Sequence, residues 1–175
     1  IFKLYFCFKH ISNTLQPSKQ YLVKVLSFLL LICSNTFAQY NMDSLKIIIE
    51  NPKLHDTVKL NTLALIIDNV YDPDSILTYS KKMYEIAQKN LNRKDLNKKQ
   101  RNHYLLYLAA YYSNISFCYE QVRNPKSLSY LNKSIALYEK ANATEEVYSS
   151  IVSKGILLSR RKQYKEAIDC YFKAL

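Results

Sequence analysis

The sequence predicts an all-α protein made of antiparallel helix pairs, and three observations support this prediction. The chain of 175 residues holds only one Gly and four Pro, so few residues interrupt long helices. Apolar side chains recur at helical spacing from residue 56 to residue 175. No stretch alternates apolar and polar residues with a period of two, so we expect no sheet.

Residues 19–38 have the layout of a secretory signal peptide. Lys19 and Lys24 precede an apolar run over residues 25–33, and small and polar residues follow it. The run is shorter than the about 20 residues that a membrane-spanning helix needs. We therefore expect an exported chain, periplasmic or on the extracytoplasmic side of a membrane protein, with residues 1–18 as an N-terminal extension of uncertain role. A buried core helix is the alternative interpretation of the run.

Helix signals follow one another through the rest of the chain. Residues 39–55 form a short helical lead-in that ends at Asn51 and Pro52. Six helices are expected after it. They cover residues 56–70, 73–90, 99–122 and 125–140, and two more open at Thr144 and near Gln163.

Side chains that accept backbone hydrogen bonds mark three of the expected helix starts. Asp56 and Asp72 are the predicted N-caps of the first two helices. Pro73 follows Asp72 at the first helical position, where the missing N–H costs nothing. Asn124 and Pro125 repeat this order, so we expect the same kind of start there.

The residues that commonly carry chemistry form no catalytic or metal-binding pattern in the sequence. The three histidines are scattered and no C-x-x-C pair occurs, so we expect no zinc site. The single Gly excludes the glycine-rich phosphate loops. Cys118 and Cys170 lie in apolar helical patterns and are expected to be buried, unpaired thiols. We therefore predict no catalytic residue, no cofactor and no metal ligand in this stretch.

The last two expected helices carry the spacing G-x8-Y-x2-A-[IL]-x2-[YF]-x2-A-L. The residues that match it are Gly155, Tyr164, Ala167, Ile168, Tyr171, Ala174 and Leu175. This pattern resembles the tetratricopeptide repeat (TPR) family. The resemblance implies an α-solenoid over residues 56–175, with about three units and the last one cut at Leu175. A non-repeat helical bundle is the alternative.

In such repeats a small residue of the first helix packs opposite a small residue of the second. Gly155 and Ala167 take these positions in the third unit, so Gly155 is expected to accept Ala but not Leu. Units one and two are degenerate, because Ile76 and Met83 are large where the family prefers Ala. The repeat-packing positions implied by the resemblance are Ala64, Ser116, Ser127, Gly155, Tyr164, Ala167, Tyr171 and Ala174.

The resemblance also implies a concave binding face, lined by the first helix of each unit. Its candidate groove residues are Asn61, Asp68, Ser113, Glu120, Gln121, Ser159 and Arg160, together with Leu65, Asn69, Phe117, Val152 and Ile156. This lining is mixed, neither strongly basic nor apolar, and the binding chemistry stays open.

The order of a signal peptide, a short helix and degenerate repeats is similar to the N-terminal extracytoplasmic segment of bacterial signalling proteins. In those proteins a spanning helix follows, and then a histidine kinase or a helix-turn-helix regulator, which here would fall beyond Leu175. The implied function is a sensor or protein-interaction segment with a protein or peptide partner. Membrane attachment would come only through that spanning helix, and the oligomeric state stays open.

Two other functions compete with the sensor segment. The first is a free periplasmic scaffold protein. The second is a nucleic-acid-binding helical repeat. The net charge of +11 and the basic residues over 89–101 favour this alternative. A solvated lysine-rich surface explains the charge equally, and we expect no nucleic-acid partner for this segment.

Overall fold

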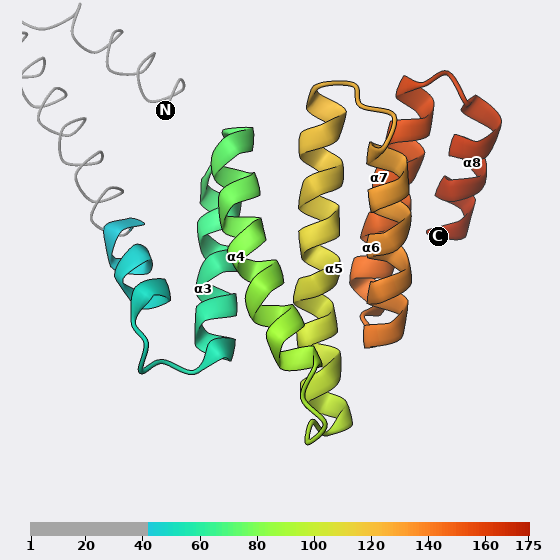
Figure 1. Ribbon diagram of the computed structural model, residues 1–175. Helices are drawn as coiled ribbons and strands as arrows, with labels where there is room; N and C mark the ends of the chain where they lie inside the picture. The colour runs from blue at the N-terminus through green and yellow to red at the C-terminus, as the bar shows by residue number, and fades with distance from the viewer. Residues whose placement is uncertain (1–41) are drawn as a thin grey trace, which may run out of the picture. The chain divides into compact units, whose positions relative to one another are not determined.

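The computed structural model describes residues 42–175, and every regular element in this range is an α-helix (Figure 1). The prediction of an all-α protein is confirmed for these residues. A short helix covers residues 42–50. The helices that follow are α3 (Asp56–Asn69), α4 (Pro73–Leu91), α5 (Lys98–Gln121), α6 (Ser127–Ala141), α7 (Thr144–Arg160) and α8 (Tyr164–Lys173). The expected signal peptide at 19–38 and the extension at 1–18 lie outside the described residues.

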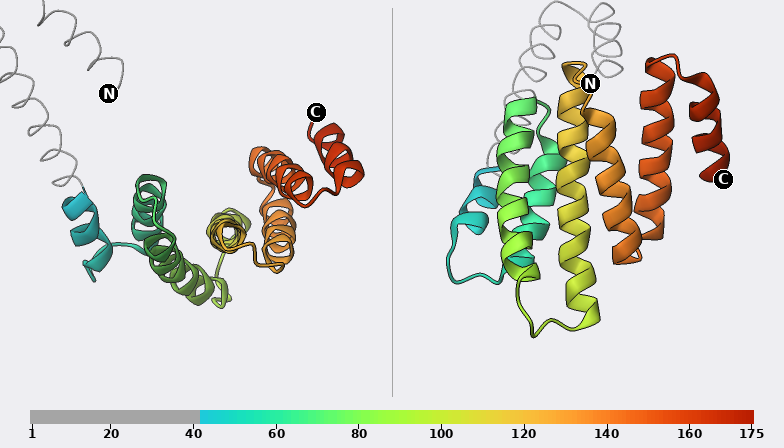
Figure 2. Two further views of the ribbon diagram at one scale, coloured as in Figure 1. Left: turned by 90° about the horizontal axis from the view of Figure 1, so that it is seen from above. Right: turned by 45° about the vertical axis from the view of Figure 1, so that its right-hand side comes forward.

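Within the unit formed by residues 48–175, each helix from α3 to α8 packs mainly against its neighbours in the chain. Consecutive helices run in opposite directions and stand side by side (Figures 1 and 2). The turns at 70–72, 142–143 and 161–163 are too short for any other arrangement, because a helix that follows such a turn must fold back beside its predecessor.

Three of the helix starts, those of α3, α4 and α5, use side-chain caps. Asp72 Oδ1 accepts the backbone N–H of Ser75 at 2.7 Å, with Pro73 at the first helical position, as predicted. Helix α5 begins with a capping box that the sequence analysis did not predict. Asn97 Oδ1 accepts the N–H of Gln100 at 2.9 Å, and Gln100 Oε1 accepts the N–H of Asn97 at 3.0 Å.

The predicted caps of α3 and α6 are wrong. His55, not Asp56, is the N-cap of α3, and its Nδ1 accepts the N–H of Thr57 at 3.2 Å. The Asp56 carboxylate reaches the end of α4 instead, where it accepts from Asn90 Nδ2 at 2.8 Å. Helix α6 starts at Ser127, with no side-chain cap.

Asn124 lies in the turn before α6 and stabilises that turn rather than the helix. Its Oδ1 accepts the N–H of Lys126 at 3.0 Å, which closes a tight turn ahead of the first helical residue. Pro125 is therefore inside the turn, not at the first position of α6.

A residue in the left-handed conformation follows each of the helices α5, α6 and α7 within two positions. These residues are Arg123 (φ 52°), Asn142 (φ 56°) and Lys162 (φ 63°). The next amide donates to a carbonyl five residues back, as from Asn124 to Tyr119 at 2.8 Å. This is the Schellman ending, in which Gly is the usual residue and Asn the next best. Arg123 and Lys162 therefore occupy backbone positions that a side chain makes costly.

Small hydroxyl side chains allow α5 and α6 to approach closely. Ser134 and Ser116 are buried, and each satisfies its hydroxyl on the partner helix. Ser134 Oγ donates to the Ala109 carbonyl at 2.8 Å, and Ser116 Oγ donates to the Ser127 carbonyl at 2.8 Å. Because these buried groups are paired, they do not carry the cost of an unsatisfied polar atom.

Tyrosines join α4, α5 and α6 along one side. The rings of Tyr84 and Tyr111 lie 4.6 Å apart, and those of Tyr112 and Tyr130 are stacked at 6.2 Å. Lys133 Nζ lies 5.5 Å from the Tyr130 ring centre, a cation–π distance. These tyrosines are half-buried, so they contribute to packing between helices.

The expected repeat-packing residues differ in burial. Ser116, Ser127, Gly155 and Ala167 are buried, and Ala64 and Ala174 are half-buried. Tyr164 and Tyr171 are 60% and 38% exposed, although packing positions are expected to be covered. Helix α8 packs mainly against α7, so its other side faces solvent.

The space next to Gly155 is filled by an aromatic ring. A Cβ at this position would lie 2.6 Å from Cε1 of Tyr171, closer than carbon atoms can approach. The expectation that Ala167 faces Gly155 did not include this ring. A side chain at position 155, Ala as well as Leu, would therefore displace the Tyr171 ring.

Candidate binding face and arginine notch

Exposed large apolar side chains are unevenly distributed over the helices. Helices α3, α5 and α7 carry all of those that lie within α3 to α7, and α4 and α6 carry none. They are Val58 and Leu65 on α3, Phe117 on α5, and Tyr148, Val152 and Ile156 on α7. We call the side of α3, α5 and α7 that presents these residues the first-helix face.

Most of the predicted groove residues lie on the same stripes of these helices. Leu65 is four residues after Asn61, Phe117 four after Ser113, and Ile156 four after Val152, so each pair shares one helix face. Asn61, Asp68, Gln121 and Arg160 are exposed, and Ser113, Glu120 and Ser159 are half-buried.

Asn61 is partly engaged within the fold. Its Oδ1 accepts a hydrogen bond from the hydroxyl of Tyr107 on α5. Burial raises the pKa of the Tyr107 hydroxyl, so it stays protonated and can donate. The contact joins α3 directly to α5, which brings the first helices of the first two pairs together.

A hollow of about 700 Å³ lies where α5 ends, α6 begins and α7 ends. We call it the arginine notch. Its lining residues are Glu120, Gln121, Arg123, Pro125, Arg160 and Arg161. Three of the predicted groove residues, Glu120, Gln121 and Arg160, thus come together at one end of the first-helix face.

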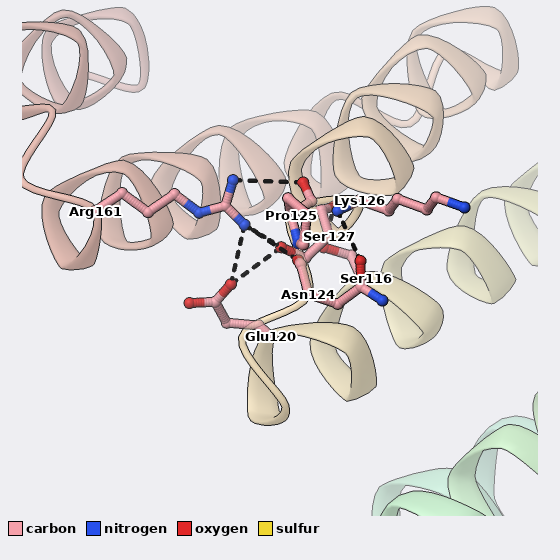
Figure 3. Close-up of polar contacts among 7 residues, drawn as sticks. All are labelled: Ser116, Glu120, Asn124, Pro125, Lys126, Ser127 and Arg161. Atoms are coloured by element: carbon pink, nitrogen blue, oxygen red, sulfur yellow. Dashed lines mark hydrogen bonds and ion pairs between the residues drawn. The ribbon is translucent and has the colours of Figure 1, made fainter.

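Arg161 lines the notch and forms hydrogen bonds with Glu120 and with the turn before α6 (Figure 3). Its Nη2 donates to Ser127 Oγ at 2.6 Å and lies 3.4 Å from Glu120 Oε2 and from the Asn124 carbonyl oxygen. Nη1 donates to the Pro125 carbonyl at 3.5 Å. The end of α7 is therefore fastened to the turn between α5 and α6.

Glu120 is engaged in the same network. Its Oε2 accepts the Ser127 hydroxyl at 3.0 Å as well as the Arg161 guanidinium. The side chains of Glu120 and Arg161 are only 15% and 26% exposed, so this pair is less screened than a surface ion pair. The negative charge of the notch is thus already balanced by one of its three arginines.

Arg123 and Arg160 have no such partners. Among the residues that the structure describes, their guanidiniums make no hydrogen bond or ion pair. Since Arg161 balances Glu120, the two free guanidiniums leave the notch with a charge of about +2 at neutral pH. Such a hollow attracts anions.

The sequence analysis did not predict Arg123 and Arg161 as site residues. Arg161 acts through contacts with residues more than thirty positions away, which no local pattern reveals. The position of Arg123 could have been recognised from the sequence. It lies seven residues after Ser116, just as Lys162 lies seven residues after Gly155. That shared offset marks the turn after the first helix in both units.

A second hollow, of about 620 Å³, brings His55 and His103 together. His103 Nε2 is buried without a hydrogen-bond partner among the described residues, and burial lowers the pKa of this imidazole. The ring lies 5.1 Å from that of Tyr107. Glu146 also lines the hollow, but no hydrogen bond joins it to either imidazole in the described part of the chain.

The basic cluster around the α4–α5 turn is partly neutralised. Arg93 holds Asp95 through Nη2–Oδ2 and Nε–Oδ1 distances of 2.6 and 3.1 Å. Lys89 Nζ lies 3.5 Å from Asp56 Oδ2. Both bases therefore have local acidic partners, in contrast to Arg123 and Arg160.

Within residues 42–175 the two cysteines, Cys118 and Cys170, are free; Cys118 is buried and Cys170 half-buried. Burial raises the pKa of the Cys118 thiol, and the negative charge of Asp74 adds to this. A protonated thiol is a poor nucleophile. Across residues 42–175 no group of His, Cys, Asp and Glu is arranged to hold a metal ion. Over the same range no helix combines the length and apolarity that a membrane span needs.

Comparison with known proteins gives no relative: no family model, no curated protein and no solved structure matches the chain.

Proposed function

We propose that residues 48–175 are a helical-repeat module of the tetratricopeptide type that binds a protein or peptide partner along the first-helix face. The observation that carries this proposal is the exposure of Leu65, Phe117, Val152 and Ile156 on that face. Helices α4 and α6 leave their large apolar side chains buried or half-buried, so among α3 to α7 the exposure is confined to one set of helices. Helix α8, which packs mainly against α7, also exposes apolar side chains, namely Tyr164, Ile168, Tyr171 and Phe172. Apolar side chains gathered on one exposed face are typical of interaction surfaces.

Two geometric features support a repeat arrangement. Helices pack mainly with their chain neighbours, as in solenoids built from stacked helix pairs. The turns after α5 and α7 also share one design, with left-handed Arg123 and Lys162 at the same offset from the buried small residues Ser116 and Gly155. The first pair differs, because Val70, which ends α3, is extended.

The proposal also includes an extracytoplasmic role, as the sensor segment of a signalling protein. Its support is the signal-like order of residues 19–38, followed by helical repeats with the D-P-D-S start at residues 72–75. A fusion to a reporter that is active only outside the cytoplasm tests export. A cytoplasmic product that retains residues 25–33 would contradict it.

Site-specific photo-crosslinking in cells that express the native protein tests the binding face. A photoreactive phenylalanine analogue replaces Phe117 or Ile156 on the first-helix face. Matched controls carry it at Lys82 on α4 or Ser129 on α6, which are also exposed. We expect one partner to be captured from the first two positions only.

The partner is then purified, and its affinity is measured for the native chain and for Phe117→Ser and Ile156→Ser. Loss of one buried apolar contact should weaken binding by about 10- to 100-fold. Equal capture from all four positions, or unchanged affinity of both variants, would refute the proposed face.

A further inference from the structure

We infer that the arginine notch is a subsite for the carboxylates of an acidic peptide segment whose apolar side chains lie on Phe117 and Ile156. The inference rests on the proposed function, because it specifies the chemistry of the partner that the first-helix face takes. The ligand class is an extended peptide that combines acidic and apolar residues.

The first step is the state of the three arginines. Arg161 donates to Ser127 Oγ, to two backbone carbonyls and to Glu120, so its guanidinium is occupied by the fold. Arg123 and Arg160 line the same hollow without partners in the described residues. A guanidinium presents a planar fork of N–H donors that fits both oxygens of a carboxylate. The notch thus offers two forks to an incoming acid.

The second step is the backbone at Arg123. The residue is left-handed, with φ of 52°, at a position where Gly is the favoured choice. Its backbone N–H donates to the Glu120 carbonyl at 2.9 Å, so the turn holds this conformation. The chain carries a basic side chain at a costly position, directly at the rim of the notch. The turn therefore fixes where the Arg123 side chain leaves the backbone beside the notch.

The third step is the distance between the charges and the apolar side chains. Arg160 is four residues after Ile156, and Gln121 is four residues after Phe117. One helical turn rises about 5.4 Å, which an extended peptide covers with about two residues. Residues two apart in an extended peptide also point to the same side. The face therefore fits a peptide in which an apolar residue and an acid lie two positions apart.

A nucleic acid fits this site less well than a peptide. It needs a basic track that follows its backbone, whereas the notch holds two free guanidiniums beside apolar side chains. The other basic cluster has part of its charge paired, as Arg93 is with Asp95. Single-stranded DNA is accordingly one of the probes in the test.

The test measures binding of labelled peptides to the full chain by fluorescence anisotropy. The probe repeats the unit Leu-Ser-Glu-Ser. Its matched controls replace Glu by Gln, Glu by Lys, or Leu by Ser, and an oligothymidylate and inorganic phosphate complete the set. The protein variants are Arg123→Gln, Arg160→Gln and Phe117→Ser. Arg101→Gln, an exposed arginine at the other end of α5, is the control variant.

We expect the Leu-Ser-Glu-Ser peptide to bind most tightly, with affinity that falls as salt rises. Replacing Glu by Gln, or either notch arginine by Gln, should weaken it about tenfold, and Arg101→Gln should leave it unchanged. If the Gln peptide binds equally well and only Phe117→Ser weakens it, the binding face stands and the inference about the notch is wrong.

Three other results also overturn the inference. If the Ser-for-Leu peptide or phosphate matches the full probe, the notch takes anions without the apolar contact. If the oligothymidylate binds best and depends on Arg123 and Arg160, the ligand is a nucleic acid. If no probe binds, both the notch and the acidic partner are refuted, whereas the photo-crosslinking still decides the proposed face.

Discussion

Replacing Gly155 by Ala tests the packing between α7 and α8, because two effects of opposite sign compete there. Ala favours the interior of a helix over Gly by about 1 kcal/mol. The new Cβ would lie 2.6 Å from Cε1 of Tyr171, so the ring must move by nearly 1 Å or change rotamer. Overpacking a close-packed core costs about 1–3 kcal/mol, and the Tyr171 ring, which is 38% exposed and can shift, lies at the low end of this range. We expect the clash to offset the propensity gain, so that Gly155→Ala changes the free energy of unfolding by less than about 0.5 kcal/mol.

A double-mutant cycle separates the two effects. In a Tyr171→Ala background the ring is gone, so Gly155→Ala should stabilise the fold by about 1 kcal/mol. The coupling energy between positions 155 and 171 is then about 1 kcal/mol. A second cycle with Tyr164→Ala, an exposed tyrosine on the same helix, should show no coupling.

Urea unfolding of the full chain, followed by circular dichroism, gives each free energy of unfolding from the midpoint and slope. The Gly155→Leu variant should lose more stability than Gly155→Ala, because its longer side chain meets the same ring. If Gly155→Ala stabilises the native chain as much as it stabilises the Tyr171→Ala chain, so that the coupling is below about 0.5 kcal/mol, the contact between these residues is not the reason for the glycine.

Three further perturbations follow from the local geometry. Asn97→Ala removes one half of the capping box of α5 and should lower the free energy of unfolding by about 1 kcal/mol in the same urea assay; no change would show that the box does not hold the helix start. Arg123→Gly and Lys162→Gly relieve left-handed backbone and should each stabilise the fold by roughly 0.5–1 kcal/mol, and a loss of stability would contradict the cost assigned to these turns. Burial lowers the pKa of His103 in the folded chain below its usual 6.5. Between the folded pKa and 6.5 the unfolded chain therefore binds more protons than the folded chain, so the free energy of unfolding should fall as the pH drops through this window. His103→Gln should flatten that dependence, measured as the urea midpoint against pH, and an unchanged slope would show that another group causes it.

The sequence predicted those features that depend on nearby residues. The helix class, the Asp72–Pro73 start of α4 and the free cysteines follow from spacing and from single side chains. The errors at Asp56 and Asn124 have a common cause. Each side chain could accept a local amide, but Asp56 binds Asn90 of the partner helix and Asn124 closes the preceding turn.

Contacts between side chains of different helices could not be predicted from the sequence. The repeat pattern predicted that Ala167 faces Gly155. The contact of Gly155 with the Tyr171 ring depends on how α8 packs against α7, which the pattern does not specify. The first-helix stripes were predicted from the resemblance, and Glu120, Gln121 and Arg160 do line one hollow. Their role in binding stays a prediction. The guanidinium of Arg161 was missed because its partners are joined only by the folding of three helices.

The notch takes its residues from two successive helix pairs, which has a mechanical consequence. Arg123 follows α5 in one pair, and Arg160 ends α7 in the next, while Arg161 links the two pairs through Ser127. Any bending between the pairs changes the separation of the two free guanidiniums. A ligand bound by both guanidiniums would fix the angle between the two helix pairs. Its release would allow the pairs to bend relative to each other again. Occupancy of the notch would therefore limit bending between these two helix pairs.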